Sequence, residues 1–506
     1  MSARTNTNGG ASEGTGWLAL IVVSASAYSP LMTWANAGES PKLPTLSLMV
    51  AGLIAIGLGL WRLLVVFHLD KVGSASASAL FVFTASNTGE LVGRYHALDR
   101  LGLVVLAVVI AVIGYRLRGV APYRFVISWL ALFVLAQPVV TLLSSSASAA
   151  ALNVDTAVDL ELSGMNTKPD ILLVVFDAYA SQETLRELYD FDNREVLDQL
   201  ADRGFDAPGT TWANYGRTQL SVPSVLQLDY AAEATEITGN DVDALMAVLG
   251  GESRLSTALQ AEGYRHVYVE SGWLGSRCGP TVDVCVRSPW PDESFYDVVY
   301  RSVLRGFPGF EVGRSFAQGG LHVIDWLTND LKSYLDDGQP DFIFAHALLP
   351  HPPLFLDGRC SPDWGGGIPG FEIGRPGLSE EETTRARMRY LDQVACVNSV
   401  LISIADQLNG DDVMIAMGDH GPDSQGQLFV QGTDWNDDQK RERLGAFLAT
   451  KVPGCDMSDI ESLVNVGRRM MSCLSGDPFP DLDTHIFDMH KSSTGNFVYQ
   501  LEKPAG

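Results

Sequence analysis

Three apolar runs of this sequence are each followed by side chains that can bind a metal ion. Those side chains are two carboxylates and three imidazoles: Asp177, His346, His351, Asp419 and His420. Aspartate and histidine together suit a divalent ion of the zinc or manganese kind, with magnesium or calcium as further candidates. The sequence therefore predicts a metal centre built from the ends of several strands.

Asp419 and His420 are adjacent in the chain, so both can point to one place only if the backbone turns sharply there. Gly418 and Gly421 flank the pair and give the backbone that freedom. A Gly-Asp-His-Gly segment is also typical of an ordinary polar turn after a strand. Taken alone, this segment leaves the metal site and the plain turn as alternatives.

The segment from Asn214 to Ser224 predicts a loop that enters a helix near Thr218. Free backbone N–H groups and the helix dipole favour an anionic ester group at such a point. A metal-bound Thr218 hydroxyl could lose its proton and attack phosphorus, and Arg217 could bind the oxyanion of the transition state. The alternative is that Thr218 only caps the helix, as threonine often does.

Strands and helices alternate in the second part of the chain. The expected strands are 171–176, 265–270, 341–347 and 412–417, and the expected helices are 181–203, 323–336 and 380–408. A continuous apolar strand such as 171–176 is typical of a parallel sheet that is buried on both faces. We therefore expect an α/β domain with a central, mostly parallel sheet, whose ligands gather at the carboxyl ends of the strands.

The first part of the chain is rich in apolar stretches. They lie at residues 17–38, 45–67, 74–89, 101–118 and 125–146, and they predict an α-helical membrane bundle of about five spans. The basic residues Lys71, Arg116, Arg118 and Arg124 then fall in cytoplasmic loops, which places everything after Ser144 outside. Because the spans carry almost no charge, anchoring is favoured over transport.

The expected organisation follows from these spans. It comprises a cytoplasmic tail (1–16), a transmembrane bundle (17–146), a tether (147–168) and an extracytoplasmic catalytic domain (169–506). The protein would be a multi-pass protein of the plasma membrane.

The charge and the cysteines both belong to the outer domain. The net charge is −25, yet residues 1–150 hold nine Lys or Arg against five Asp or Glu, so the rest of the chain is strongly acidic. Such a domain repels nucleic acid. All six cysteines follow residue 277, and an even count in an exported domain suggests disulfides. Sequential pairing is the simplest of the fifteen connectivities.

Four segments resemble the signature regions of the alkaline phosphatase and sulfatase superfamily: 170–181, 214–230, 345–353 and 413–424. The nearest branch is the membrane-anchored, sulfatase-like proteins that include lipoteichoic acid synthases and phosphoethanolamine transferases. Those enzymes place a threonine nucleophile three residues before Ser-x-Pro, as Thr218, Ser221 and Pro223 stand here. The resemblance implies an alkaline-phosphatase-like domain behind the membrane bundle.

The resemblance also implies roles for the candidate residues. The metal would be held by Asp177, Thr218, Asp419 and His420, with Thr218 also the nucleophile. His346 and His351 would contact the substrate, and His351 would help the leaving group. Arg217, from its charge beside Thr218, is a further candidate for substrate binding and catalysis. One metal is the expected count, although His346, His351 or His485 could bind a second.

Two positions depart from the family pattern. Asp177 stands where the better-known transferases often have glutamate. Val225 follows Ser221-Val222-Pro223-Ser224, so the signal for formylglycine modification is incomplete, which weakens a sulfatase assignment.

The sequence thus predicts a membrane-anchored, metal-dependent phosphotransferase or phosphoester hydrolase that acts on cell-envelope lipids or glycans. A sulfatase and a catalytically silent scaffold are the alternatives, and the oligomeric state stays open. Trp212 and Tyr215 are expected to serve packing, and Arg441 and Arg443 to be solvated charges near the site.

Overall fold

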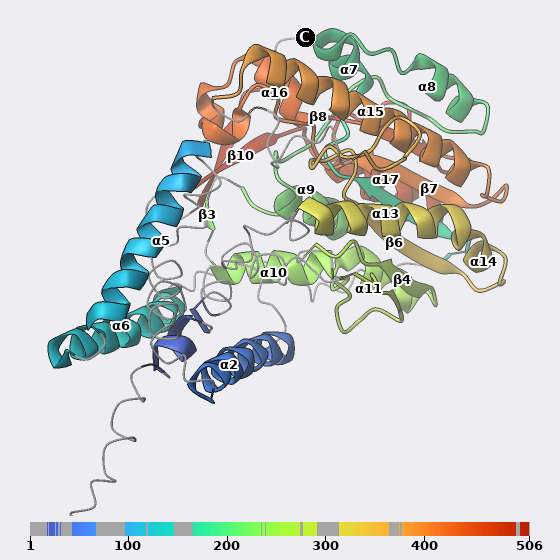
Figure 1. Cartoon of the computed structure of the whole chain (residues 1–506). Coiled ribbons are helices and arrows are strands. Elements are labelled where there is room, and N and C mark those ends of the chain that lie inside the picture. The colour runs from blue at the N-terminus through green and yellow to red at the C-terminus, as the bar shows by residue number, and fades with distance from the viewer. Residues whose placement is uncertain are drawn as a thin grey trace, which may run out of the picture. The chain divides into compact units, whose positions relative to one another are not determined.

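The structure is a computed structural model with two units (Figure 1). It describes residues 18–28 (without 19 and 26), 31, 43–66, 97–117, 120–145, 164–273 (without 166, 234 and 238), 277–290, 313–363, 374, 377–491 and 496–504. The first unit comprises Met1–Ser148 and Glu293–Val312, and the second comprises Ala149–Asp292 and Gly313–Gly506.

Helices occupy three of the predicted apolar stretches in the first unit. They are α2 (Leu43–Val66), α5 (Ala97–Leu117) and α6 (Ala121–Ser145). Within the described part of the chain, no helix combines the length and the apolar character needed to cross a membrane. The predicted stretch 74–89 lies outside the described residues, and 17–38 is described only in part, with helical residues between 18 and 28.

A six-stranded sheet forms the centre of the second unit. Its order is β5 (Val284–Val286), β4 (Arg265–Val269), β6 (Asp341–Ala347), β1 (Ile171–Phe176), β7 (Val413–Gly418) and β9 (Leu448–Lys451). All neighbours pair in parallel except β7 and β9, so the predicted mostly parallel sheet is confirmed. Phe176 at the end of β1 is in register with Ala347 of β6 and Gly418 of β7, which brings the three strand ends level.

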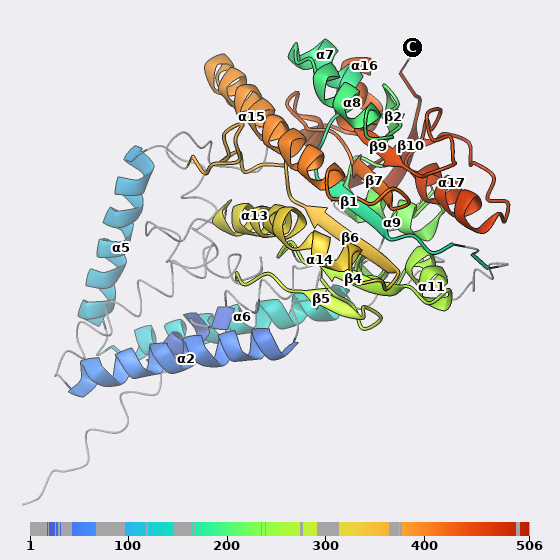
Figure 2. The ribbon, with the colours of Figure 1, turned by 90° about the vertical axis from the view of Figure 1, so that its right-hand side faces the viewer.

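Helices cover both faces of this sheet, and Figure 2 shows the sheet between the two layers. One face carries α7 (Gln182–Tyr189), α8 (Arg194–Ala201), α13 (Gly313–Asn329), α14 (Leu331–Leu335) and α15 (Glu380–Ala405). The other carries α9 (Thr218–Gln227), α10 (Gly239–Leu249), α11 (Arg254–Ala261) and α17 (Val464–Ser475). Alternate residues of β1 enter the two cores, which explains its unbroken apolar run.

The predicted single helix 181–203 is wrong, because the structure has two helices there. Asp190 adopts a left-handed conformation (φ 53°) and ends α7, while Asn193 precedes α8. Aspartate and asparagine tolerate such breaks better than other residues. The amphipathic pattern of the segment continued across the break, so it gave no sign of it.

Several short elements were not expected from the sequence. The hairpin of β10 (Ile486–Lys491) and β11 (Asn496–Leu501) pairs with β3 (Glu236–Ile237). A second small sheet joins β2 (Thr211–Trp212) to β8 (Gly445–Ala446), and α16 (Asp437–Leu444) precedes β8. These elements surround the loops that leave β7 and enter α9.

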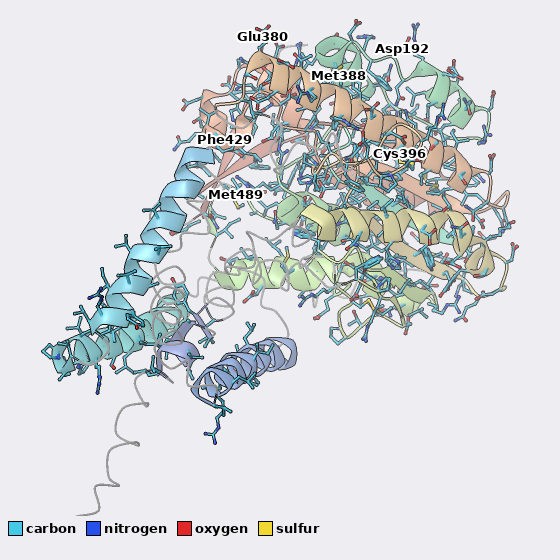
Figure 3. The ribbon with its side chains drawn as sticks, viewed as in Figure 1. Asp192, Glu380, Met388, Cys396, Phe429 and Met489 are labelled. Atoms are coloured by element: carbon cyan, nitrogen blue, oxygen red, sulfur yellow. A yellow bond between two sulfur atoms is a disulfide. The ribbon has the colours of Figure 1, made fainter. Side chains whose placement is uncertain are left out.

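The six cysteines form three disulfides in sequential order: Cys278–Cys285, Cys360–Cys396 and Cys455–Cys473. The predicted pairing is confirmed. Cys396 lies on α15 (Figure 3), so its disulfide ties that helix to the segment that follows β6.

Candidate active site

The carboxyl ends of β1 and β7 place the predicted site residues side by side. Asp177 follows β1, and Asp419 and His420 follow β7. Thr218 comes from the other direction, as the first residue of α9. All four side chains are buried, with exposed fractions of 5% for Asp177, 0% for Asp419, 2% for His420 and 7% for Thr218.

The turn after β1 holds Asp177 in an unusual backbone setting. Ala178 has φ 62°, a conformation that non-glycine residues rarely adopt. Its N–H donates to Asp419 Oδ1 at 3.0 Å, and its carbonyl accepts from the Tyr390 hydroxyl at 2.8 Å. The strained turn is thus held from two sides, as is common for backbone outliers at functional sites.

Gly418 and Gly421 are required for a reason other than the predicted freedom of the turn. Neither glycine has a positive φ. Instead, a Cβ on residue 418 would lie 2.1 Å from the Tyr179 carbonyl oxygen, and one on residue 421 would lie 1.9 Å from that of Glu442. The β7 loop therefore needs glycine because other backbone segments pass against it.

The spacing of Thr218 and Ser221 has a geometric explanation. Residues three apart lie on the same face of a helix. The Ser221 hydroxyl donates to the Asp419 carbonyl oxygen at 2.6 Å and so attaches α9 to the β7 loop. This contact holds Thr218 over the same loop, with its Oγ1 3.3 Å from His420 Nε2.

His420 presents one nitrogen to the site and uses the other for support. Its Nδ1 lies 3.0 Å from the Gly421 carbonyl oxygen, which can only accept a hydrogen bond, so Nδ1 carries the hydrogen. The lone pair of Nε2 then faces three oxygens, namely Asp419 Oδ2 at 3.3 Å, Thr218 Oγ1 at 3.3 Å and Asp177 Oδ1 at 3.8 Å.

These donor atoms fit a divalent metal. Asp177, Asp419 and His420 each offer an atom, and the three atoms lie within 4.8 Å of one another. Asp177 Oδ1 and Asp419 Oδ2 are buried and accept no hydrogen bond. Buried carboxylate oxygens and an imidazole lone pair in one place require a shared positive charge, which a zinc or manganese ion would supply.

The other cluster of metal-binding residue types in the described chain is Glu270, Cys278 and Cys285. Its two cysteines are joined in a disulfide, so their sulfurs are not metal ligands.

The three other histidines that the sequence suggested lie at different distances from this centre. His346 is fully buried, with Nε2 3.6 Å from Asp177 Oδ2 and its ring edge-to-face with Trp273. His351 is partly exposed, and its Nδ1 donates to the Pro352 carbonyl oxygen at 2.5 Å. His485 lies elsewhere, beside Gln500 and Tyr230. Their predicted roles stay predictions.

The two carboxyl groups of the centre have opposite pKa shifts. Burial, together with the charge of Asp177, raises the pKa of Asp419 to about 6. Burial also acts to raise the pKa of Asp177, but His351, His346 and His420 outweigh it and hold that pKa below its ordinary value. Burial and the Arg443 charge keep the pKa of His420 well below its ordinary value, so its ring is neutral at pH 7.

Arg217 stands immediately before Thr218 and lacks a full set of partners. Its Nε is buried without an acceptor. Burial and the charge of Arg443 lower its pKa, while the nearby acids Asp488 and Asp423 oppose this shift. A guanidinium with a spare donor next to a nucleophile is suited to an anionic group.

Two charged residues at the site were missed or misjudged from the sequence. Arg443, expected to be solvated, is 5% exposed and reaches His420 Nε2 at 3.4 Å. Asp488 of β10 is 5% exposed, accepts from the Gly432 N–H at 2.9 Å and interacts with both arginines. Neither carries a motif, and only tertiary structure brings them to the site. The packing role expected for Tyr215 is confirmed, since it is buried and stacks on Phe487.

No protein-family model and no curated protein matches the sequence. Three solved structures similar to the chain cover different shares of it. The carboxy-terminal periplasmic domain of Escherichia coli EptC, in complex with Zn, is 13% identical over 66% of this chain and 94% of that one (TM-score 0.42). The integral membrane lipooligosaccharide phosphoethanolamine transferase A of Neisseria meningitidis is 13% identical over 91% of this chain and 96% of that one (TM-score 0.39).

The third is a phosphonate monoester hydrolase from Silicibacter pomeroyi, 14% identical over 63% of this chain and 79% of that one (TM-score 0.41). These likenesses concern the fold, and the function below is drawn from the side chains of this chain. The solved structures to which the chain is similar thus include phosphoethanolamine transferases, phosphonate monoester hydrolases and a sulfatase.

Proposed function

We propose that this chain is a metal-dependent phosphoryl-group transferase or phosphoester hydrolase that uses Thr218 as its nucleophile. One observation carries the proposal. The Thr218 hydroxyl lies 3.3 Å from His420 Nε2, which together with two unpaired carboxylate oxygens forms a set of metal-binding atoms. A helix cap alone would not require such a set beside it.

Asp177, Asp419 and His420 would hold the metal, with the Thr218 hydroxyl as a further ligand. A divalent ion there would supply positive charge that lowers the pKa of the Thr218 hydroxyl and polarises a phosphoryl oxygen. The protein contributes the position of the hydroxyl, which Ser221 secures through the Asp419 carbonyl oxygen. It also limits contact with bulk water, since the four residues are 7% exposed or less.

In the first step, Thr218 Oγ1 bonds to phosphorus as the bond from phosphorus to the leaving oxygen breaks. Arg217, at the positive end of α9, would bind the phosphoryl oxygens as charge builds on them. With its Nδ1–H donated to the Pro352 carbonyl oxygen, His351 would use Nε2 to take up the proton that Thr218 gives up and pass it to the leaving oxygen. In the second step, an oxygen of water or of an acceptor hydroxyl attacks phosphorus and releases Thr218.

We also propose that the first unit attaches the chain to a membrane, so that its substrate is an envelope lipid or glycan. Phe125, Trp129 and Phe133 stand four residues apart on α6 and are 65%, 59% and 70% exposed. Large apolar side chains on one exposed helix face favour contact with lipid or with a partner. Val105, Val108 and Val112 of α5 are similarly exposed, at 54%, 57% and 52%.

A kinetic experiment on the full-length chain tests the catalytic proposal. The metal content of the purified chain is measured, and release of nitrophenol is followed from bis-nitrophenyl phosphate, nitrophenyl phosphate and nitrophenyl sulfate. Thr218→Ala should lower turnover of the phosphoesters by at least about 10³-fold, because the step loses its nucleophile. Thr384→Ala changes an exposed threonine of α15 and should match the wild type.

Different results would point to the alternatives. Turnover of the sulfate ester alone would favour a sulfatase. A wild-type chain that is metal-free and inactive on all three esters would favour a silent scaffold and contradict the proposal.

A further inference from the structure

Arg443 is a buried cation for which the proposed mechanism has no use so far. It lies in the last turn of α16 and is only 5% exposed. A charged group is stable away from water only if its donors find acceptors. The groups that accept hydrogen bonds from the Arg443 guanidinium therefore indicate its role in the site.

The guanidinium of Arg443 connects the two loops that carry the site. Its Nε and Nη2 both donate to the Gly216 carbonyl oxygen, at 2.9 and 2.6 Å. Its Nη1 donates to the Gly421 carbonyl oxygen at 2.9 Å. Gly216 is two residues before Thr218, and Gly421 directly follows His420, so one side chain joins the nucleophile loop to the metal-ligand loop.

Of these two acceptors, the Gly421 carbonyl oxygen is the one that also contacts His420. It also accepts from His420 Nδ1, the hydrogen bond that leaves Nε2 with its lone pair toward the site. The Gly421 N–H in turn donates to the Arg443 carbonyl oxygen at 2.9 Å, so the two residues are bound in both directions. By fixing this carbonyl, Arg443 fixes the orientation of the His420 ring.

Arg443 Nη2 also lies 3.4 Å from His420 Nε2. This contact is long, and an Nε2 lone pair that binds a metal cannot also accept a hydrogen bond. The bonds to the two carbonyl oxygens are shorter and do not compete with a metal. They are the contacts on which a positioning role can rest.

We propose that Arg443 is a positioning residue, which sets both the His420 ring orientation and the distance between Thr218 and His420. The inference rests on the proposed function, because it assigns Arg443 to the geometry of that transfer step. It also makes a claim about metal affinity that can be measured without turnover.

The experiment uses the full-length chain and three variants. Arg443→Met keeps the length of the side chain without its donors, and Arg443→Lys keeps the charge without the fork that binds two carbonyls. Arg441→Met changes the neighbouring arginine on α16, whose side chain is 31% exposed, and serves as the control. Zn²⁺ affinity is measured by calorimetry, together with kcat, KM and the melting temperature of the metal-free chain.

Arg443→Met should weaken Zn²⁺ binding by about 10–100-fold, as loss of support for a ligand histidine does. It should lower kcat by about 10²-fold with a smaller change in KM, because misplacement of reacting groups acts on the chemical step. Arg443→Lys should fall between Arg443→Met and the wild type. Arg441→Met should match the wild type in all three quantities.

Wild-type Zn²⁺ affinity and kcat in folded Arg443→Met would overturn the inference. If Arg443→Met does not fold, the same measurements on Arg443→Lys test the inference. Weaker Zn²⁺ binding at an unchanged melting temperature supports positioning, and wild-type values contradict it. A wild-type chain that binds Zn²⁺ without turnover would contradict the proposed function but not the positioning role of Arg443. A wild-type chain that binds no Zn²⁺ would contradict both the proposed function and that role.

Discussion

Two acidic and two basic side chains lie around Thr218. Asp177 and Asp419 are the acids of the metal-binding set, and Arg217 and Arg443 are the buried cations beside it. The acids face each other closely enough that the charge of one raises the pKa of the other. Without a metal, this arrangement costs stability above the pH at which Asp419 ionises, and a bound cation would remove that cost.

The first prediction concerns Asp419→Asn in the metal-free chain. The pKa of Asp419 is about 6 in the folded chain, above its ordinary value of 3.8, so the wild type loses stability as pH rises between these values. Asparagine does not ionise and keeps the oxygen that accepts from Ala178. The variant should melt a few degrees above the wild type at pH 7.5, and the difference should shrink below pH 6.

Thermal melts in the presence of a chelator measure this effect. With Zn²⁺ present, the order should reverse, since the variant lacks one ligand. A variant that melts below the wild type at pH 7.5 without metal would contradict the assigned electrostatics.

At the scale of elements, the site depends on how closely backbone segments approach one another. The loops after β1 and β7, the start of α9 and the end of α16 meet at Gly216, Gly418 and Gly421. Hydrogen bonds from Ser221 and Arg443 then fix α9 and α16 to the β7 loop. The side chains are placed by these contacts rather than by any single loop.

The second prediction tests this close approach with Gly421→Ala. Its Cβ would lie 1.9 Å from the Glu442 carbonyl oxygen, so the β7 loop or α16 must move. We expect a loss of at least about 2 kcal/mol in the free energy of unfolding, and loss of Zn²⁺ affinity. Gly410→Ala is the matched control, because its Cβ would meet no atom within 4 Å. Chemical denaturation of both variants gives the comparison, and equal stabilities would contradict the account.

The third prediction concerns the amino ends of the strands, where Asp170 precedes β1. Burial raises its pKa to about 7, with help from Asp412, Asp341 and Asp337, although the hydrogen bond from the Asp341 N–H opposes the shift. The folded chain therefore loses stability relative to the unfolded chain as pH rises from about 4 to 7. Asp170→Asn keeps the acceptor oxygen and should gain stability over the wild type across that range, reaching a plateau above pH 7.

Urea denaturation at pH 4.5, 6 and 8 measures the trend. Asp198→Asn, at an exposed position on α8, should show no such pH dependence. A stability difference for Asp170→Asn that does not change with pH would show that burial of this carboxylate is not the cause.

The sequence predicted the elements that carry strong local patterns. Of the four expected strands, β1 and β7 are apolar runs buried on both faces, and β4 and β6 combine buried apolar residues with a few polar ones. Thr218 and Ser221 could be found because their spacing is a property of one helix. The antiparallel strand β9, the β10–β11 hairpin, Arg443 and Asp488 could not, since their places depend on contacts between segments far apart in the chain.

At the scale of the whole molecule, the two units differ in character. The second unit buries its apolar side chains in two cores around the sheet. The first exposes many of them, including the aromatic face of α6. The strong negative charge of the chain, −25, belongs to the part outside residues 1–150 and suits a domain in water. This contrast supports attachment through the first unit.

The fourth prediction is that the full-length chain sediments with membranes and stays there after a carbonate wash, because its apolar helices contact lipid. Replacing Phe125, Trp129 and Phe133 by serine should increase the share of the chain that the carbonate wash releases from the membranes. Substitution of the exposed Met388 of α15 by serine is the control and should leave the distribution unchanged. A wild-type chain released fully by carbonate would contradict the proposed attachment.

The central claim is that Thr218 takes up the transferred group, and trapping that group tests it most directly. The full-length, Zn²⁺-loaded chain is mixed with bis-nitrophenyl phosphate, quenched in acid within the first turnovers and digested for mass spectrometry. The account predicts one added nitrophenyl phosphate group, on Thr218, and no adduct in Thr218→Ala. Turnover without any adduct on Thr218, or an adduct that persists elsewhere in Thr218→Ala with undiminished turnover, would contradict it.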